Sequence, residues 1–550
     1  TTARSCGRTS SGPTARVRAG TQRVDHPGDP VTDQILDARS FWELLDRRVA
    51  ATPDRVLLID DAGRSLTCAE FRDTVERVAA GFHGLGIGEG TAVTWELPTR
   101  IETVVASFAL SRLGAVQNPI IHIYRHREVG FCIRQTGAEF VLHPGEWGGF
   151  DYGAMVAEVT AELDAPPTVL SGYADLPEGD PAVLPPVPAP PPAGEAPVRW
   201  LYYTSGTTSD PKGVKHTDET LIAAGTGLAK ALEATADDVG SIAFPYAHIG
   251  GPDYIVMMLV NGFPAVLIEQ FTPAGAVAAY AEHGATIIGG STAFYQMFLA
   301  EDQKVDGPAM PALRAMAGGG APKPPEIFFE VKEKMGIPIA HGYGMTECPM
   351  ICQGSPSDTD DQLAHTEGAP IEGCEVSVVG PDGSEVAPGV EGEVRVRGPM
   401  LFKGYTDPSL EADAFDEQGR FRTGDLGIRR EDGHITLTGR VKDIIIRKGE
   451  NISAKEVEDV LYALPQVENA AVIGLPDAER GERVCAVVET ADGQSDLTFD
   501  EMVTACADAG LMRQKTPEQL EIWDGPLPRN ATMKILKYEL RDELEDHPWP

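Results

Sequence analysis

The chain has 550 residues, enough for several domains, and carries 46 Lys and Arg against 83 Asp and Glu, a formal net charge of −37. This charge argues against a nucleic-acid partner and disfavours docking on an anionic membrane, because both are bound by basic protein surfaces. No stretch approaches the roughly 18 uninterrupted apolar residues of a transmembrane helix. The eight cysteines are scattered, with no Cys-x-x-Cys and no zinc spacing, which fits a reducing cytosol.

Residues 1–30 differ in composition from the rest of the chain. Five arginines precede the first acidic residue, Asp25, among Ser, Thr and Gly. This composition is typical of a transit peptide, but a disordered tail is the simpler interpretation and the one that we favour. The globular part is expected to begin near Ser40.

The segments that follow alternate between helix and strand patterns. Helical spacing covers 41–51, 69–85 and 102–113, and short apolar runs at 55–60 and 92–96 indicate strands. Such alternation predicts parallel sheets covered by helices. The Pro-dense run at 181–197 cannot lie inside a helix or a central strand, so we interpret it as a surface connector, with an SH3-type ligand as the alternative.

The stretch from Thr204 to Gly213 follows an apolar run at 198–203 that is typical of a buried strand. Helical spacing at 216–233 follows it, so we expect a loop that connects a strand to a helix. The loop contains two glycines, several hydroxyl side chains and Lys212, and such groups can surround phosphate oxygens. A Walker-type P-loop is excluded, because Pro211 stands where that motif needs Gly before the lysine.

Further short strands are expected at 241–244, 263–268 and 285–289. His248 lies just past the first of them, beside two glycines, and ligands of α/β folds bind at the carboxyl ends of strands. The consecutive glycines 318–320 would let a flat ring lie against the backbone.

The hexapeptide at 342–347 follows a strand expected at 337–340 and reads Gly-Tyr-Gly-Met-Thr-Glu. Its tyrosine could stack on adenine, its threonine could bind a phosphate, and its glutamate could ligate Mg²⁺. Taken alone, the hexapeptide is equally consistent with a turn before a helix.

Between 370 and 440 the pattern changes to short alternating strands with Gly turns, at 376–379, 391–396 and 435–437, which predicts a small β-barrel or sheet unit. This part contains Asp425, whose carboxylate could accept both hydroxyls of a ribose or could cap backbone N–H groups. Residues 443–550 have the size of a small α+β domain, with a helix at 454–464 and strands at 468–475 and 484–490.

Five segments of the chain resemble motifs of the acyl-adenylate-forming superfamily and occur in the same order as in that family. The superfamily contains acyl-CoA synthetases, luciferases and the adenylation domains of peptide synthetases. The five segments are 204–213, 318–322, 342–347, the pair 421–427 and 439–443, and 527–537. The resemblance covers about residues 40–540. Three positions depart from the usual family pattern: Ser209 and Met533 replace Gly, and Lys537 replaces Arg.

The resemblance implies a binding site for ATP and its AMP product, with Mg²⁺ as the metal. Thr346 and Glu347 are expected to act in catalysis, and Glu347 is the expected Mg²⁺ ligand. The residues expected to bind ATP or AMP are Thr204, Ser205, Gly206, Thr207, Thr208, Lys212, Gly319, Gly320, Ala321, Gly342, Tyr343, Gly344, Thr346, Asp425 and Arg440.

The resemblance also implies the roles of the remaining site residues. Lys534 is the expected catalytic lysine of a C-terminal loop, and Lys442 is the expected hinge between the two domains. Lys448, Gly449 and Glu450 are expected to line the channel for coenzyme A. The residues expected to border the acyl pocket are His248, Gly289, Gly290, Gly318 and Met345.

The implied fold is α/β, with a large N-terminal domain of doubly wound β/α subdomains plus a small β-barrel, followed by a small α+β domain that rotates about the hinge. We therefore predict a tail at 1–30, an N-terminal domain at 31–441 that binds AMP and the acyl group, and a mobile C-terminal domain at 442–550.

The implied activity is the AMP-forming ligation of a carboxylic acid to coenzyme A through an acyl-adenylate. Because several expected pocket residues are glycines and none is charged, we favour a hydrophobic acid: medium-chain, alicyclic or aryl. One alternative is a stand-alone enzyme that loads a carrier protein, although amino-acid-activating relatives usually have Asp where this chain has Ile249. The other is a catalytically impaired relative that only binds nucleotide. We expect a cytoplasmic enzyme, with a homodimer as an open question.

Overall fold

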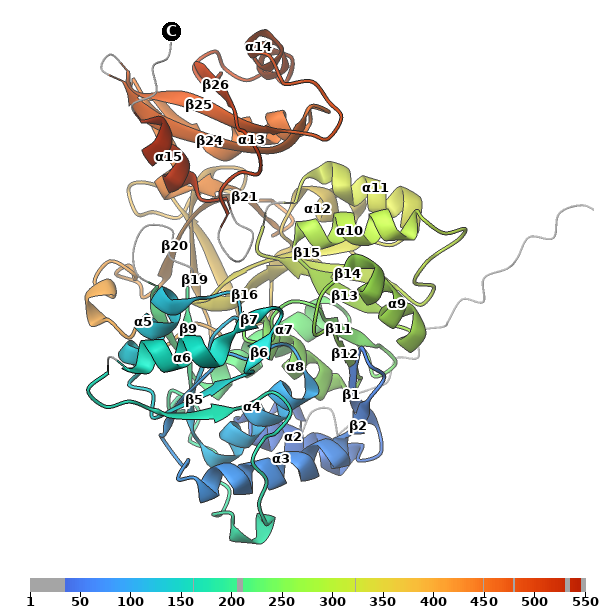
Figure 1. Ribbon diagram of the computed structural model, residues 1–550. Coiled ribbons are helices and arrows are strands. Elements are labelled where there is room, and N and C mark those ends of the chain that lie inside the picture. The colour runs from blue at the N-terminus through green and yellow to red at the C-terminus, as the bar shows by residue number, and fades with distance from the viewer. Residues whose placement is uncertain are drawn as a thin grey trace, which may run out of the picture.

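The computed structural model describes residues 35–161, 163–204, 211–321, 323–448, 450–477, 480–529 and 535–545. The tail expected at 1–30 lies outside these ranges. The described chain forms a large N-terminal part and a smaller C-terminal part at one end of it (Figure 1). Among the described residues, no helix is both long and apolar enough to cross a membrane.

The first sheet of the large part has six strands in the order β10-β9-β4-β3-β5-β8, and all except β10 run parallel. Helix α4 packs on β4, while α5 and α6 pack together over β3 and β5. The elements are β3 (Ala92–Trp95), α4 (Ile101–Leu113), β4 (Val116–Pro119), α5 (His126–Thr136), β5 (Phe140–His143), α6 (Tyr152–Ala161), β8 (Thr168–Ser171), β9 (Trp200–Tyr203) and β10 (Gly213–His216).

Helices α2 (Phe41–Ala51) and α3 (Cys68–Gly84) start where the sequence supplies caps. The Thr67 hydroxyl accepts from the Glu70 backbone N–H, and the Glu70 carboxylate accepts from the Thr67 backbone N–H. This reciprocal pair satisfies two backbone donors that the first turn of a helix leaves free. The apolar faces of both helices are buried against α4.

Two further sheets complete the doubly wound region. A four-stranded sheet has the order β11-β12-β1-β2, and a five-stranded sheet has the order β13-β14-β15-β16-β17. Their strands are β1 (Val56–Asp60), β2 (Ser65–Thr67), β11 (Gly240–Ile242), β12 (Ala265–Leu267), β13 (Ile287–Gly290), β14 (Ala315–Gly319), β15 (Ile339–Met345), β16 (Cys348–Gln353) and β17 (Ala369–Pro370).

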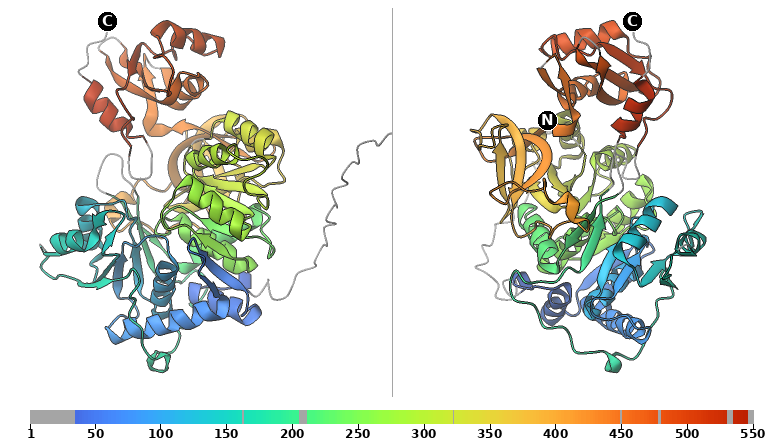
Figure 2. Two further views of the ribbon diagram at one scale, coloured as in Figure 1. Left: turned by 45° about the vertical axis from the view of Figure 1, so that its right-hand side comes forward. Right: turned by 90° about the vertical axis from the view of Figure 1, so that its left-hand side faces the viewer.

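Helices cover these sheets, and α9, α10 and α11 lie beside β13, β14 and β15 (Figures 1 and 2). The strands β13, β14 and β15 are parallel, as the alternation predicts. The helices are α7 (Asp218–Ala231), α8 (Gly250–Asn261), α9 (Pro273–His283), α10 (Thr292–Asp302), α11 (Pro325–Met335) and α12 (Asp360–His365).

The expected helix at 216–233 is wrong at its start. Residues Gly213–His216 form strand β10, which pairs antiparallel with β9, and helix α7 begins only at Asp218 after the cap residue Thr217. The strand β9 is therefore followed in the described chain by a second strand, β10, and not by a helix. A strand of four residues is too short for its periodicity to be separated from the following helix.

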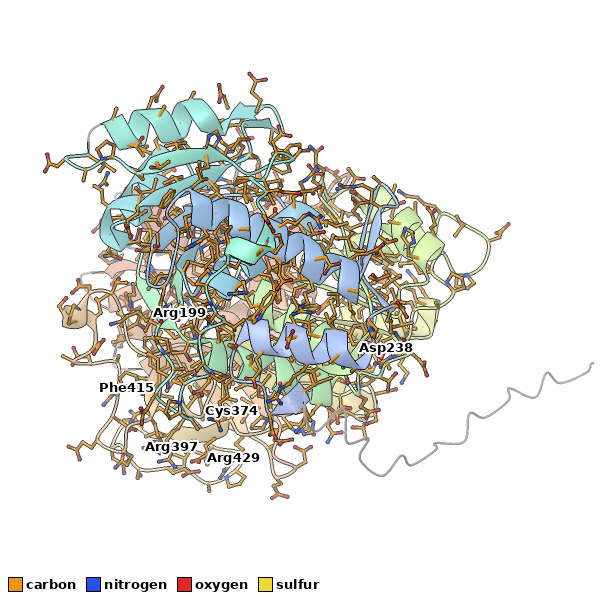
Figure 3. All side chains as sticks on the ribbon, turned by 90° about the horizontal axis from the view of Figure 1, so that it is seen from below. Arg199, Asp238, Cys374, Arg397, Phe415 and Arg429 are labelled. Carbon is orange, nitrogen blue, oxygen red and sulfur yellow. The ribbon has the colours of Figure 1, made fainter. Side chains whose placement is uncertain are left out.

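The third unit is a four-stranded antiparallel sheet of β18 (Glu375–Val379), β19 (Glu391–Arg397), β20 (Phe421–Arg429) and β21 (Ile435–Arg440). Its outer strands do not pair with each other in the described part of the chain, so the small β unit is an open sheet and not the expected closed barrel. Seen from below, this side of the molecule carries Arg397 and Arg429 (Figure 3), which form ion pairs with Glu375 and Glu385.

The C-terminal part is a mixed sheet in the order β23-β22-β25-β24, with β26 parallel to β25. Alternate residues of its strands enter two cores, one under α13 and α14 and the other under α15. Both faces are therefore covered. The elements are β22 (Ile444–Arg447), β23 (Glu450–Ser453), α13 (Ala454–Tyr462), β24 (Val467–Asp477), β25 (Gly481–Thr490), α14 (Phe499–Asp508), β26 (Gln519–Ile522) and α15 (Lys537–Leu544).

A short 3₁₀ turn, Val441–Asp443, connects β21 to β22. Ile435 before it belongs to the core of the third sheet, and Ile445 after it belongs to a core of the C-terminal part. A domain boundary at 441/442 stays a prediction, and this change of core at the turn supports it.

Candidate active site

The carboxyl ends of β13, β14 and β15 are built from glycines that stand opposite one another. Gly290 pairs with Gly318, and Gly319 pairs with Gly342. A Cβ on Gly318 would lie 1.7 Å from the Gly290 carbonyl oxygen, and one on Gly319 would lie 2.4 Å from the Gly342 carbonyl oxygen. Side chains at these positions would push the strands apart. The sheet therefore brings Gly290, Gly318, Gly319 and Gly342, predicted from separate motifs, to one edge.

The predicted phosphate loop begins and ends at the stem of the β9–β10 hairpin. The Thr204 backbone N–H donates to the Lys212 carbonyl at 3.0 Å, and the Lys212 N–H reaches the Thr204 hydroxyl at 3.4 Å. These bonds hold Lys212 next to the end of β9. Ser205, Gly206, Thr207 and Thr208 lie outside the described residues, as does Ser209.

Thr346 and Glu347 form the tight turn of the β15–β16 hairpin, in which Met345 pairs with Cys348. The expectation of a turn before a helix is wrong here, because a strand follows. His216, at the end of β10, donates from Nε2 to the Thr346 carbonyl at 2.7 Å. Burial lowers the pKa of His216 to about 4, so this imidazole is neutral at neutral pH. The strand that follows the phosphate loop thus holds the turn that carries Glu347.

Glu347 is held by residues 402–405, which belong to none of the predicted motifs. The Tyr405 hydroxyl donates to Glu347 Oε1 at 2.8 Å, and the Phe402 backbone N–H donates to the Glu347 carbonyl at 2.9 Å. Lys212 Nζ lies 5.3 Å from the centroid of the Tyr405 ring. The roles of His216 and Tyr405 were not predicted, because both act through partners that are distant in sequence and neither has a periodic or motif signal.

Tyr343, Asp425 and Arg440 form a second polar group. The Tyr343 hydroxyl donates to Asp425 Oδ2 at 2.6 Å, and Arg440 Nε lies 2.8 Å from Asp425 Oδ1. Burial and the neighbouring carboxylate raise the pKa of Tyr343 well above its usual value, so the phenol stays a donor. Asp425 is buried, and Arg440 is half-exposed. The structure thus places three predicted nucleotide-binding residues together. That Tyr343 stacks on adenine stays a prediction.

His248 lies at the start of α8 and is exposed. Its Nδ1 accepts from the Gly250 backbone N–H at 3.2 Å, so Nδ1 carries no proton. A neutral imidazole whose Nδ1 accepts must carry its proton on Nε2. Phe244 contacts both the His248 ring and the Tyr254 ring, with centroids 6.4 and 5.2 Å apart. The Tyr254 hydroxyl lies 2.3 Å from where a Cβ of Gly289 would be, so His248 and Gly289 border one aromatic group.

Other predicted residues lie around the same strand ends. Gly320 has a left-handed φ of +81°, and the Ala321 carbonyl accepts from His341 Nε2 at 3.0 Å. Burial lowers the pKa of His341 to about 3, which makes this ring another neutral donor. Gly344 and Met345 complete β15, and Met345 is half-buried. Their expected contacts with nucleotide and acyl group stay predictions.

The residues expected to act in the second step lie at the start of the C-terminal part. Lys442 is exposed in the 3₁₀ turn, next to Asp443, whose Oδ1 lies 3.6 Å from Arg541 of α15. Lys448 is exposed with a left-handed φ of +52°, and its N–H donates to the Arg480 carbonyl. Gly449, the side chain of Glu450 and Lys534 lie outside what the structure describes.

Two regions of the chain match known protein families. Residues 45–406 match the family of AMP-binding enzymes, and residues 456–534 match the C-terminal domain of AMP-binding enzymes. The chain is 31% identical to a salicyl-AMP ligase/salicyl-S-ArCP synthetase of Mycobacterium tuberculosis, with 92% of this chain and 91% of the relative covered. It is 29% identical to a medium-chain fatty-acid–CoA ligase of Escherichia coli, with coverages of 92% and 90%.

A solved structure has the same architecture. O-succinylbenzoate coenzyme A synthetase from Bacillus subtilis, in complex with ATP and magnesium ion, superposes with a TM-score of 0.79 at 27% identity, and 92% of this chain and 99% of that chain are covered. The two matched regions extend over most of the chain and include the motifs at 204–213, 318–322 and 342–347 and most of the motif at 527–537, whereas 421–427 and 439–443 lie between them. The chain therefore belongs to the AMP-binding enzymes, the acyl-adenylate-forming family of ligases.

Proposed function

We propose that this protein joins a hydrophobic carboxylic acid to coenzyme A, with ATP cleaved to AMP and pyrophosphate. The observation that carries the proposal is that Tyr405 contacts both Lys212 and Glu347, while Tyr343, on the strand that leads to Glu347, donates to Asp425. Of the relatives, the medium-chain fatty-acid–CoA ligase and the O-succinylbenzoate coenzyme A synthetase support this substrate class.

The nucleotide would lie across the glycine edge of β13–β15. Asp425 would accept the ribose hydroxyls, since a carboxylate has more acceptor positions than its two bonds to Tyr343 and Arg440 occupy. Lys212 would hold the phosphates through its charge. Glu347 fits a magnesium ion, because Oε1 accepts from Tyr405 while Oε2 has no hydrogen-bond partner in the described part of the chain. The metal, when bound, would neutralise phosphate charge.

The acid would bind beside His248 and Gly289. The neutral imidazole offers its Nε2–H as a donor without adding a charge, and the next residue, Ile249, is buried and apolar. Neither residue would pair with a substrate ammonium group, which disfavours amino acids. The rings of Phe244 and Tyr254 lie beside these residues, and an aromatic surface suits an apolar acyl group.

The chemistry has two steps. A carboxylate oxygen of the acid attacks the α-phosphorus of ATP; the new P–O bond forms as the bond to pyrophosphate breaks, which gives acyl-AMP. Catalysis of this step is mainly positioning and positive charge, and we assign the second charge to Lys534. The thiolate of coenzyme A then attacks the acyl carbon and AMP leaves. Rotation about Lys442, with Lys448 to Glu450 facing the new channel, would separate the two steps.

Exchange of labelled pyrophosphate into ATP, measured with a panel of acids, tests the first step. Medium-chain, alicyclic and aryl acids should support exchange, whereas acetate and amino acids should not. Exchange only with acetate or only with amino acids would contradict the proposed pocket.

A second candidate function is the loading of an acyl group onto a carrier protein, which the salicyl-AMP ligase/salicyl-S-ArCP synthetase relative favours. Both functions share the adenylation step. They differ in the thiol that accepts the acyl group. If the enzyme exchanges pyrophosphate but added coenzyme A does not cause AMP to be released, carrier-protein loading is favoured. A catalytically impaired relative would bind ATP without exchange.

Two further predictions concern the location of the protein in the cell and its oligomeric state. A cytoplasmic location is consistent with the thiols, because the seven described cysteines are free and buried. A homodimer stays open, and light scattering on the purified protein would decide it.

A further inference from the structure

We propose that Tyr405 is a positioning residue, which orients the Glu347 carboxylate towards the metal and at the same time fixes the Lys212 ammonium. This inference rests on the proposed function only in taking Mg·ATP as a substrate. Tyr405 belongs to none of the motifs expected to bind the nucleotide, and the inference follows from contacts between three segments of the chain, 403–406, 212–215 and Glu347.

The first observation is the hydrogen bond between Tyr405 and Glu347. Both side chains are buried, with 3% and 6% of their surfaces exposed, and the phenol donates to Oε1 at 2.8 Å. With Oε1 fixed, the carboxylate can rotate little, and Oε2 is the oxygen left to ligate a cation.

The second observation is that Tyr405 is itself fixed to the strand that leaves the phosphate loop. Val214 of β10 forms a bridge with Tyr405. On either side, the Lys215 N–H donates to the Gly404 carbonyl at 3.0 Å and the Thr406 N–H donates to the Gly213 carbonyl at 2.8 Å. The residues 403–406 thus form an extra edge segment on β10. The position of Tyr405 is therefore fixed relative to β10 by backbone bonds.

The third observation is that the Tyr405 ring lies under Lys212, with Nζ 5.3 Å from the ring centroid. A cation over an aromatic face is attracted to it, most strongly where water is excluded. One side chain therefore contacts both the loop cation and the metal carboxylate. It sets the distance between the two groups that would bind opposite sides of the same polyphosphate.

The two contacts can be separated by substitution. Tyr405→Phe removes the hydroxyl and keeps the ring, whereas Tyr405→Leu removes both. We expect Tyr405→Phe to raise the Mg²⁺ concentration for half-maximal ATP binding by about 10- to 100-fold, as for other partners of metal ligands, and to change metal-free ATP binding by less than about twofold. Tyr405→Leu should weaken metal-free ATP binding as well.

The measurement is the thermal stabilisation of the full chain by ATP across a Mg²⁺ titration, without acid or coenzyme A. Tyr462→Phe is the matched control, because its hydroxyl donates to the Ala470 carbonyl at 3.1 Å inside the C-terminal part. It should leave the Mg²⁺ dependence unchanged. Equal Mg²⁺ dependence in wild type and Tyr405→Phe would overturn the inference.

A double-mutant cycle separates positioning from a general structural effect. In a Glu347→Gln background, adding Tyr405→Phe should change the Mg²⁺ dependence by less than about twofold, because the carboxylate that it orients is gone. The full wild-type effect in that background would overturn the inference. Since the assay omits the acid, a failed acid panel would affect the proposed function alone, whereas a wild type without Mg²⁺-dependent ATP binding would overturn both.

Discussion

The bond between Tyr343 and Asp425 gives a direct test of how the nucleotide is held. The phenol donates at 2.6 Å to a carboxylate that is 4% exposed. Hydrogen bonds to charged groups contribute about 1.5–3 kcal/mol. If this bond orients Asp425 for the ribose, Tyr343→Phe should weaken ATP binding by about 10- to 150-fold, since each 1.4 kcal/mol is a factor of ten.

The assay is equilibrium binding of ATP and of 2′,3′-dideoxy-ATP to wild type and Tyr343→Phe. Wild type should prefer ATP, because only ATP has the hydroxyls that Asp425 would accept. Tyr343→Phe should lose most of this preference while its affinity for the dideoxy nucleotide changes little. An equal loss for both nucleotides would refute the orienting role and would favour direct stacking of Tyr343 on adenine.

Three further substitutions have defined outcomes. Glu96 is buried with no hydrogen-bond partner for either oxygen among the described residues, and burial raises its pKa well above the usual value, so its ionisation is unfavourable in the fold. Below the unfolded-state pKa of this carboxyl, near 4.5, the free energy of unfolding is not reduced by Glu96. As the pH rises from there towards the folded-state pKa, the free energy of unfolding falls. Glu96→Gln should therefore be stabilising at pH 7 by about 1–3 kcal/mol in urea unfolding, with the gain shrinking towards pH 4; a constant gain would contradict this. Gly318→Ala should lower the free energy of unfolding by about 1–3 kcal/mol or more through overpacking. Gly88→Ala is the control, because its new Cβ meets no atom within 4 Å, and it should cost less than about 0.5 kcal/mol. Similar melting temperatures for both variants would argue against the close strand packing. Asp443→Asn loosens the contact to Lys537 at 3.9 Å. Because an ion pair this long that is still reached by water contributes at most about 1 kcal/mol, adenylation should slow by no more than about fivefold. A larger loss would mean that the pair does more than tether α15.

Much of the architecture follows from local pattern. The alternation of apolar runs and helical spacing predicts the parallel strands β3, β13 and β15, and the glycines at 318–320 fall at a strand end because only glycine fits there. The pairing of β10 with β9 was not predicted, because β10 has only four residues and strand pairing depends on the tertiary fold.

The candidate site was predictable where one motif supplies several groups, as at 342–347. It was not predictable where a group is positioned by a distant segment. Tyr405 reaches Glu347 across 58 residues and joins β10 across about 190, so no local pattern encodes the contact. His216 likewise looks like an ordinary residue at the end of a strand until the fold brings the Thr346 carbonyl to it across 130 residues.

The central claim is that the acyl group ends on coenzyme A. Mass spectrometry of the products formed from ATP, Mg²⁺, coenzyme A and one hydrophobic acid that supports pyrophosphate exchange tests it most directly. The account predicts an acyl-CoA thioester with one AMP released per thioester. Acyl-AMP that accumulates on the protein with no thioester, and that a carrier protein discharges, would contradict it.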